Sequence, residues 1–119
     1  ICVAQSTVEH AVDATIRLFS QKSPPTALFT VDSLMTQGAL LAFRSMGISI
    51  PHDVSLIGFD DFNLATFTDP QISVIAQPVS EIGRAAGRRR LERIAGKKKP
   101  PEKISFETKL IVRGSVRRR

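Results

Sequence analysis

Hydrophobic residues recur at helical spacing in three segments of the chain, which we expect to be helices. The first segment begins at Ser6-Thr7-Val8-Glu9, a motif that fits a capping box, and ends before Pro24-Pro25. The second covers residues 33–46 and is followed by Gly47, a residue type common at helix ends. The third covers residues 80–95. The apolar stripe of the first segment consists of Val8, Ala11, Val12, Ile16, Leu18 and Phe19.

Short apolar runs without helical spacing predict strands between these helices. Residues 26–31 and 54–59 are nearly continuous apolar runs rich in β-forming residues, so we expect strands buried on both faces. Residues 72–76 predict a third strand of the same kind. The other expected elements are a short strand over 1–4, a loop over 62–70 with room for one helical turn, and a last strand over 104–112.

The predicted order of elements is β-α-β-α-β-β-α-β, which is typical of an α/β fold with a parallel, doubly wound sheet. Such sheets bind ligands beyond the carboxyl ends of their strands. At these ends stand Asp32, the pair Asp60-Asp61 and Gln77. Because carboxylates accept hydrogen bonds from hydroxyl groups, this edge would suit a neutral polyhydroxylated ligand. It would suit phosphate poorly, because neither a glycine-rich loop nor a lysine stands beside these ends.

The charge of the chain is unevenly distributed. Its 119 residues carry a formal net charge of +6. Residues 1–83 hold three basic and eight acidic residues, a net charge of −5, whereas residues 84–119 hold fourteen basic and three acidic residues, a net charge of +11. The basic part is either a solvated face or a weak, non-specific contact for a polyanion. The lack of interleaved aromatic residues favours the solvated face.

Few residues could carry covalent or metal chemistry. The single cysteine, Cys2, lies in an apolar run, so we expect a small buried side chain and a reducing compartment. His10 and His52 are isolated from each other and from Cys2, so they lack the spacing of metal ligands. We therefore expect neither a metal nor a cofactor. No apolar run approaches the roughly 18 residues of a membrane span.

Four motifs carry the strongest functional signal. The first three are Thr26-Ala-Leu-Phe-Thr-Val-Asp-Ser-Leu-Met-Thr-Gln-Gly-Ala-Leu, Gly47-Ile-Ser-Ile-Pro-His-Asp-Val-Ser-Leu-Ile-Gly-Phe-Asp-Asp, and Asp69-Pro-Gln-Ile-Ser-Val-Ile-Ala-Gln-Pro followed by Ile82-Gly83. The fourth is Leu110-Ile-Val-Arg-Gly-Ser. With these motifs the chain resembles the lactose/galactose-repressor family over nearly its whole length, from about Ser6 to Ser115.

This resemblance implies the C-terminal lobe of a periplasmic-binding-protein-like (type I) effector domain from a bacterial transcriptional regulator of the repressor type. Residues 1–76 would belong to the second lobe, residues 77–103 would form a crossover and a helix that packs on a first lobe, and residues 104–119 would be a return strand and basic tail. A small, sugar-like effector would control binding to operator DNA, which the family contacts through a helix-turn-helix headpiece absent from this chain. The family implies a homodimer that forms through helix 33–46 and loop 62–70. It also implies a cytoplasmic protein that does not bind a membrane.

The resemblance also assigns four effector-binding positions. Asp60 matches a position that hydrogen-bonds sugar hydroxyls or a purine ring, and Gln77 matches a second position that faces the cleft. Asp32 stands where most members have Asn, and we expect it either to contact the ligand or to cap a helix, with Ser33 at the N-cap. Ser6 falls near a position where some members have an aromatic residue that stacks on the sugar.

Two other functions would use a similar fold. A solute-binding protein for sugar uptake would have the same lobes and an export signal. A phosphoryl-transfer or receiver-type domain would hold Mg²⁺ with Asp60 and Asp61, but it needs a lysine at the strand end where this chain has Gln77. No Ser-His or Cys-His set is available for acyl chemistry. We therefore expect a protein that is not an enzyme. In this reading Asp61 has a structural role and holds the loop that follows residues 54–59.

Overall fold

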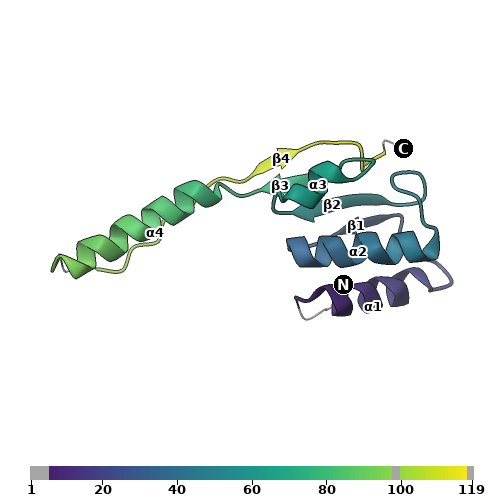
Figure 1. Ribbon diagram of the computed structural model, residues 1–119, viewed down its shortest axis with the longest axis horizontal. Coiled ribbons are helices and arrows are strands. Elements are labelled where there is room, and N and C mark those ends of the chain that lie inside the picture. The colour runs from purple at the N-terminus through teal and green to yellow at the C-terminus, as the bar shows by residue number, and fades with distance from the viewer. Residues whose placement is uncertain (1–5, 98–99, 118–119) are drawn as a thin grey trace. The chain divides into compact units, whose positions relative to one another are not determined.

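The computed structural model describes residues 6–97 and 100–117, and its contacts divide the chain into two units (Figure 1). The first unit consists of residues 1–76 and 110–119, and the second of residues 77–109. The elements are α1 (Val8–Phe19), β1 (Ala27–Phe29), α2 (Ser33–Met46), β2 (Ser55–Phe59), α3 (Asn63–Phe67), β3 (Ser73–Ala76), α4 (Val79–Ile94) and β4 (Lys109–Ile111). Their order agrees with the prediction, except that the strand expected over 1–4, like Cys2, lies outside the described residues.

Helix α1 begins with a different cap from the one that the sequence motif predicts. The N-cap is Thr7, whose Oγ1 accepts a hydrogen bond from the N–H of His10 at 3.3 Å. The predicted capping box, with Ser6 as the cap and Glu9 as its partner, is therefore wrong. A threonine hydroxyl can satisfy a free amide of the first turn as a serine hydroxyl does, so the cap moves by one residue.

The buried face of α1 is made mostly of small side chains. Its buried residues are Ala11, Ala14, Thr15 and Phe19. The remaining members of the predicted stripe, Val8, Val12, Ile16 and Leu18, are only half-buried. The reason is close packing against α2 at Gly38, where a Cβ atom would lie 2.7 Å from the carbonyl oxygen of Val8. The two helices approach so closely that only small residues fit between them.

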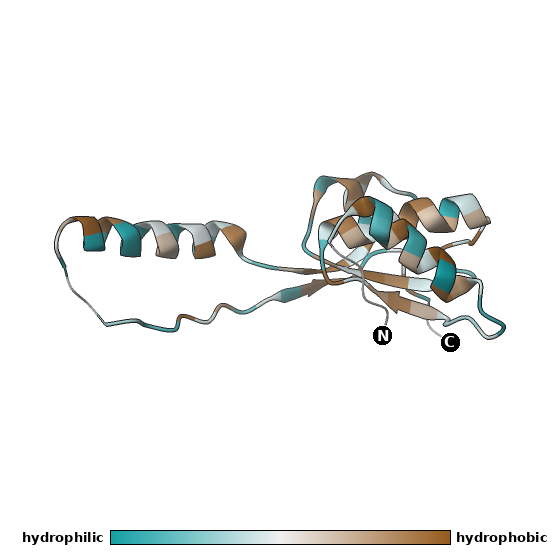
Figure 2. Ribbon diagram, turned by 90° about the horizontal axis from the view of Figure 1, so that it is seen from below, coloured by the Kyte–Doolittle hydropathy of each residue, from teal (hydrophilic) through white to brown (hydrophobic). Residues whose placement is uncertain are grey.

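The strands of the first unit form a parallel sheet in the order β1-β2-β3, with β4 next to β3. Leu28 of β1 is paired with Leu56 of β2, and Gly58 of β2 with Val74 of β3. Figure 2 shows the helices of this unit together on one side of the strands. The predicted α/β fold with a parallel sheet is therefore confirmed.

The hydrophobic core lies between α2 and the sheet. Phe43 of α2, Leu56 of β2 and Val74 of β3 are almost completely buried. The rings of Phe19 and Phe43 meet edge to face, with their centroids 4.8 Å apart. Burial of each large side chain contributes about 1.5–3 kcal/mol, so this layer is the main source of stability in the unit.

Two strands are less buried than their apolar sequences predict. In β1, Ala27 and Phe29 are exposed and only Leu28 packs against the core, with Phe29 50% exposed. In β2, buried and half-buried residues alternate. The prediction that both strands are buried on both faces is therefore wrong for the described chain. The described helices of this unit lie on one side of the strands, so the other side stays accessible (Figure 2).

The remaining elements differ from the predictions mainly in their bounds. α2 covers the predicted residues and ends at Gly47, whose φ of 68° is left-handed. α3 is the helical turn expected in the loop 62–70, and α4 begins one residue before the predicted start. The last strand is shorter than the predicted 104–112, because only Lys109–Ile111 pair in the sheet. Among the described helices, none is long and apolar enough to cross a membrane.

Candidate functional site at the carboxyl edge of the sheet

Two acidic residues lie at the edge of the sheet where the strands end. Phe29 of β1 is the register partner of Ile57 of β2, and Asp32 and Asp60 each follow three residues later. Because the two strands are parallel, both segments leave the sheet at the same edge. Both acidic residues are half-buried. The structure therefore brings two of the four predicted site residues to one edge.

Asp60 stands at a sharp turn of the backbone. Its φ is 73°, and it is the only non-glycine residue with a positive φ in the described part of the chain. Its N–H donates to the carbonyl oxygen of Ile75 at 2.9 Å, so the turn starts directly where β2 leaves β3. Aspartate tolerates this left-handed conformation better than most residues do. Residues held in such conformations cluster at ligand sites, which is consistent with the predicted role of Asp60.

Asp32 is the N-cap of α2. Its Oδ1 accepts a hydrogen bond from the N–H of Met35 at 2.7 Å. The prediction that Ser33 is the cap is therefore wrong, because Ser33 is already the first residue of the helix. Since capping occupies Oδ1, a ligand at this edge would meet mainly Oδ2. Helix capping and ligand contact, the two roles expected for Asp32, are thus compatible.

A buried pair of threonines fixes the turn between β1 and α2. The hydroxyl oxygens of Thr30 and Thr36 lie 2.7 Å apart, and the Thr36 hydroxyl also donates to the carbonyl oxygen of Asp32 at 2.9 Å. The N–H of Thr30 donates to the carbonyl oxygen of Ile57 at 3.0 Å. Gly58 leaves room for this pair, because a Cβ there would lie 2.9 Å from Thr36 Oγ1. The position of Asp32 is therefore set by buried contacts with little freedom to move.

Asp61 is held by Arg113, a residue to which the sequence motifs assigned no role. Arg113 Nη1 lies 2.8 Å from Asp61 Oδ1, and Nη2 lies 2.9 Å from Oδ2. This pair confirms the expectation that Asp61 holds the loop. It also argues against a Mg²⁺ site at Asp60 and Asp61, because one of the two carboxylates is already neutralised. The only sequence signal for Arg113 was its place in the fourth motif.

The other two predicted site residues are near strand or helix ends. Ser6 is exposed and directly precedes the cap of α1. Gln77 is half-buried, follows β3 directly and begins the second unit, where its carbonyl oxygen accepts a hydrogen bond from the N–H of Val79 at 2.9 Å. Their contact with a ligand stays a prediction. In the described part of the chain, no three His, Cys, Asp or Glu side chains lie where they could share a metal ion.

A comparison with known protein families decides the assignment of the fold. Residues 2–116 match the family described as periplasmic binding protein-like domain. The chain belongs to this family. The resemblance to the lactose/galactose-repressor family is confirmed as well. The similar proteins are transcriptional regulators, and one of them is described as a LacI family member.

Three of these relatives show how far the similarity extends. The HTH-type transcriptional regulator MalR of Streptomyces coelicolor is 42% identical over 91 residues, which are 76% of this chain and 26% of MalR. A complex of the transcriptional regulator CelR with cellobiose superimposes with a TM-score of 0.85 and 31% identity, over 94% of this chain and 34% of that chain. A LacI family transcriptional regulator from Enterococcus faecium with bound ribose gives a TM-score of 0.83 and 26% identity, over 95% and 41%. The chain therefore spans between a quarter and two fifths of these proteins.

The edge of this periplasmic-binding-protein-like domain carries two half-buried carboxylates. Asp32 and Asp60 offer carboxylate oxygens, which accept hydrogen bonds and donate none when ionised. Hydroxyl groups of a ligand can donate to these oxygens, whereas an anionic ligand would be repelled. The two carboxylates lie next to backbone turns that are fixed by Thr30, Thr36 and the β2–β3 ladder. The domain therefore presents a preformed set of hydrogen-bond acceptors.

Proposed function

We propose that this chain senses a small, sugar-like effector within a bacterial DNA-binding transcriptional regulator of the repressor type. The observation that carries the proposal is the pair of half-buried carboxylates, Asp32 and Asp60, at the carboxyl edge of a parallel sheet. Two structural relatives, whose complexes hold cellobiose and ribose, support a sugar as the effector class. The effector would be bound and released without being converted.

In this proposal the effector's hydroxyl groups donate to Asp60 and to Oδ2 of Asp32. A hydrogen bond to a charged group contributes about 1.5–3 kcal/mol, so two such contacts would give both affinity and orientation. Gln77 and Ser6 would add contacts from the crossover and from the start of α1. Residues 1–76 would form the second lobe, 77–103 the crossover and a helix that packs on a first lobe, and 104–119 the return strand and basic tail.

Control of operator binding would follow from linkage between the two ligands. The effector must bind one arrangement of the lobes better than the other, and its binding then shifts the population of the DNA-binding form. Coupling free energies of this kind are typically about 1–3 kcal/mol. DNA would be contacted by a headpiece that this chain does not contain, and the chain alone would bind a sugar weakly because it supplies only one side of the cleft.

A thermal-shift screen tests the effector site. The complete product of the gene that encodes this chain is heated with cellobiose, ribose and other neutral sugars, and the screen is repeated with Asp60→Asn. Asparagine tolerates the left-handed backbone at this position, so the fold is kept while the charge is lost. We expect a sugar to raise the Tm of the unchanged protein and to lose this effect in the variant.

The control for this screen is Asp13→Asn, which removes the same charge from an exposed position of α1. This variant should respond to the sugar as the unchanged protein does. A sugar that stabilises the Asp60 variant equally well would remove Asp60 from the site. Tight sugar binding by the 119-residue chain alone would contradict the two-lobed cleft.

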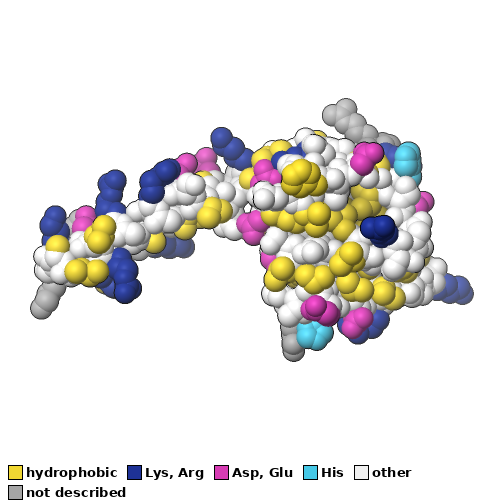
Figure 3. Space-filling view, viewed as in Figure 1, with side chains coloured by type: hydrophobic (Ala, Val, Ile, Leu, Met, Phe, Trp, Pro, Cys, Tyr) yellow, Lys and Arg dark blue, Asp and Glu magenta, His cyan; other side chains and the backbone are white. Residues whose placement is uncertain are grey.

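We also propose that the protein forms a homodimer through α2 and the loop 62–70. A groove of 580 Å³ runs between these segments, and exposed Leu41 and Leu64 lie along it. Figure 3 shows hydrophobic side chains gathered over α2 and α3. A second copy that covers this groove would remove apolar surface from water.

Sedimentation of a variant tests the dimer. Leu41→Glu together with Leu64→Glu places two charges in the groove and should shift the protein to a monomer at micromolar concentration. Val112→Glu, at a side chain that is 73% exposed in another part of the unit, serves as the control and should leave the mass unchanged. A monomeric unchanged protein, or a dimer that survives both groove substitutions, would place any interface elsewhere.

We propose the cytoplasm as the compartment, because the relatives are transcriptional regulators, which act on DNA. The same observation favours a regulator over a solute-binding protein for sugar uptake. Osmotic-shock fractionation of cells that produce the complete protein distinguishes the two: a regulator stays with the cytoplasmic fraction, whereas a solute-binding protein is released with the periplasm.

A further inference from the structure

The backbone at Asp60 is fixed by contacts on both sides of this residue. On one side, the N–H of Asp60 donates to the carbonyl oxygen of Ile75 at 2.9 Å. On the other side, the carboxylate of Asp61 is paired with the guanidinium of Arg113, with Nη1 2.8 Å from Oδ1 and Nη2 2.9 Å from Oδ2. Because peptide groups are planar, these two contacts leave little freedom to φ and ψ of Asp60. The direction of the Asp60 side chain follows from these two angles.

Asp60 depends on such contacts because its backbone has an uncommon conformation. Its φ of 73° lies in the left-handed region, which non-glycine residues adopt rarely. A residue persists in this region when the surrounding structure determines its conformation. If the contact on one side were lost, the turn would be free to relax to a negative φ, and the carboxylate would then point in another direction. The direction of Asp60 is therefore sensitive to contacts made by its neighbours.

Arg113 is itself held by contacts of the C-terminal segment. Its Nη1 donates to the carbonyl oxygen of Ile72 at 2.9 Å, and its N–H donates to Oγ of Ser73 at 2.8 Å. Two residues later, the completely buried Ser115 accepts a hydrogen bond from the N–H of Ser73 at 2.8 Å and donates to the carbonyl oxygen of Leu56 at 2.6 Å. The guanidinium therefore extends from a backbone that is bonded to both β2 and β3, and it can serve as a rigid support for the loop.

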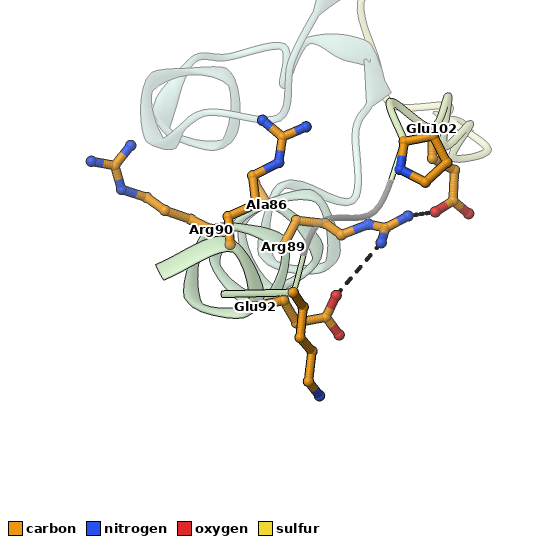
Figure 4. Close-up of a pocket in the computed structure, with 8 residues that line it drawn as sticks. Ala86, Arg89, Arg90, Glu92 and Glu102 are labelled. Atoms are coloured by element: carbon orange, nitrogen blue, oxygen red, sulfur yellow. Dashed lines mark ion pairs between the residues drawn. The ribbon is translucent and has the colours of Figure 1, made fainter. Parts of the chain in front are cut away.

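A second arginine shows that an ion pair alone does not imply this role. Arg89 pairs with Glu92 of the same helix and with Glu102, both within the second unit (Figure 4). Neither partner is adjacent in sequence to a predicted effector contact. Arg113 pairs with a residue 52 positions earlier, and that residue directly follows Asp60. It is this combination of a distant, buried support and a left-handed neighbour that distinguishes Arg113.

We propose that Arg113 is a positioning residue of the effector site. Through Asp61 it holds Asp60 in the left-handed turn and thereby sets the direction of the Asp60 carboxylate. The inference rests on the proposed function, in which Asp60 accepts a hydrogen bond from the effector. A hydrogen bond weakens steeply when its distance or angle departs from the preferred range, so a change in this direction lowers the affinity.

Calorimetric titration of the complete protein with cellobiose and with ribose tests the proposal, at a temperature where every variant is folded. Arg113→Lys keeps the positive charge but cannot bind both carboxylate oxygens and the carbonyl oxygen of Ile72. We expect its Kd to rise about tenfold or more, as for the loss of one hydrogen bond to a charged group. Asp61→Asn should also raise the Kd. The double variant should bind no more weakly than the weaker single variant, because both substitutions break the same pair.

Ser115→Ala is the matched control for these variants. It removes two buried hydrogen bonds from the same segment and leaves the pair of Arg113 and Asp61 in place. It should lower the Tm, as Arg113→Lys does, but keep the Kd. An unchanged Kd in Arg113→Lys would overturn the proposal whatever its Tm. An equal rise of the Kd in Ser115→Ala and Arg113→Lys would overturn it as well, because the effect would then come from stability alone.

Amide hydrogen exchange without a sugar tests the hold on Asp60 independently of the effector. In Arg113→Lys the N–H of Asp60 should lose protection, whereas the N–H of Thr30, which donates to the carbonyl oxygen of Ile57 at 3.0 Å, should keep most of it. Equal changes at both amides, or none at Asp60, would overturn the proposal. If neither sugar binds the unchanged protein and Asp60 alone loses protection, the effector proposal fails for these sugars and the hold of Arg113 on Asp60 is supported.

Discussion

Arg113 and Asp61 are 52 residues apart in the sequence and form a two-pronged ion pair. Nη1 lies 2.8 Å from Oδ1 and Nη2 lies 2.9 Å from Oδ2, and Nη1 also donates to the carbonyl oxygen of Ile72 at 2.9 Å. The Arg113 side chain is only 13% exposed. This pair connects the C-terminal segment that contains Arg113 to the loop that follows Asp60. The turn at Asp60 is therefore held by a contact from the residue next to it.

Arg113→Lys should destabilise the first unit by about 1–2 kcal/mol. Lysine keeps the charge but cannot make two parallel hydrogen bonds to one carboxylate and a third to Ile72. Urea unfolding measures the change. A double-mutant cycle with Asp61→Asn should give a coupling energy of about 1 kcal/mol or more, because the two side chains are in direct contact. A coupling near zero would show that the pair contributes nothing to stability.

Asp32→Ala and Asp32→Asn should have different effects on stability. Alanine removes the acceptor for the Met35 N–H, and loss of an N-cap costs about 0.5–2 kcal/mol. Asparagine caps helices about as well as aspartate, so Asp32→Asn should stay close to the unchanged protein. Thermal or urea unfolding distinguishes the two variants. Equal destabilisation would mean that the charge of Asp32, and not its capping bond, supports the fold.

Gly38→Ala should be strongly destabilising, by about 1–3 kcal/mol, although alanine normally favours helix. The added Cβ would meet Ala11 and would lie 2.7 Å from the backbone oxygen of Val8, so α1 and α2 would have to move apart. Gly87→Ala is the matched control, because a Cβ there meets nothing within 4 Å. It should preserve or raise the helix content. Similar effects of both substitutions on unfolding would contradict close packing at Gly38.

Phe43→Ala should cost about 3–5 kcal/mol, which is a large part of the stability of a domain of this size. Phe43 is 1% exposed and packs edge to face on Phe19, so truncation leaves a cavity between α2 and the sheet. Denaturant unfolding measures the loss. Val112→Ala is the comparison, since Val112 is 73% exposed and its truncation should change the free energy of unfolding by about 0.5 kcal/mol or less. Comparable losses would place the core elsewhere.

The sequence alone determined the helices and their order. The bounds of α2 agree with the prediction and those of α4 differ by one residue, because periodicity, Pro78 and the glycines that end both helices are local signals. The parallel fold followed from the alternation of these elements, and the acidic edge followed from where the predicted strands end. Local patterns suffice for features that a few neighbouring residues decide.

Only the tertiary structure decided how these elements are covered and anchored. The exposure of β1 and the small-residue face of α1 depend on which helix lies nearby, and no local pattern contains that information. The choice of Asp32 rather than Ser33 as the cap depends on where the buried Thr30–Thr36 pair starts α2. Asp61 is paired with Arg113, which lies 52 residues later in the sequence. These features result from contacts between segments that are distant in the sequence. The free energy of such a contact depends on packing and geometry in the folded chain, which a local sequence pattern does not contain.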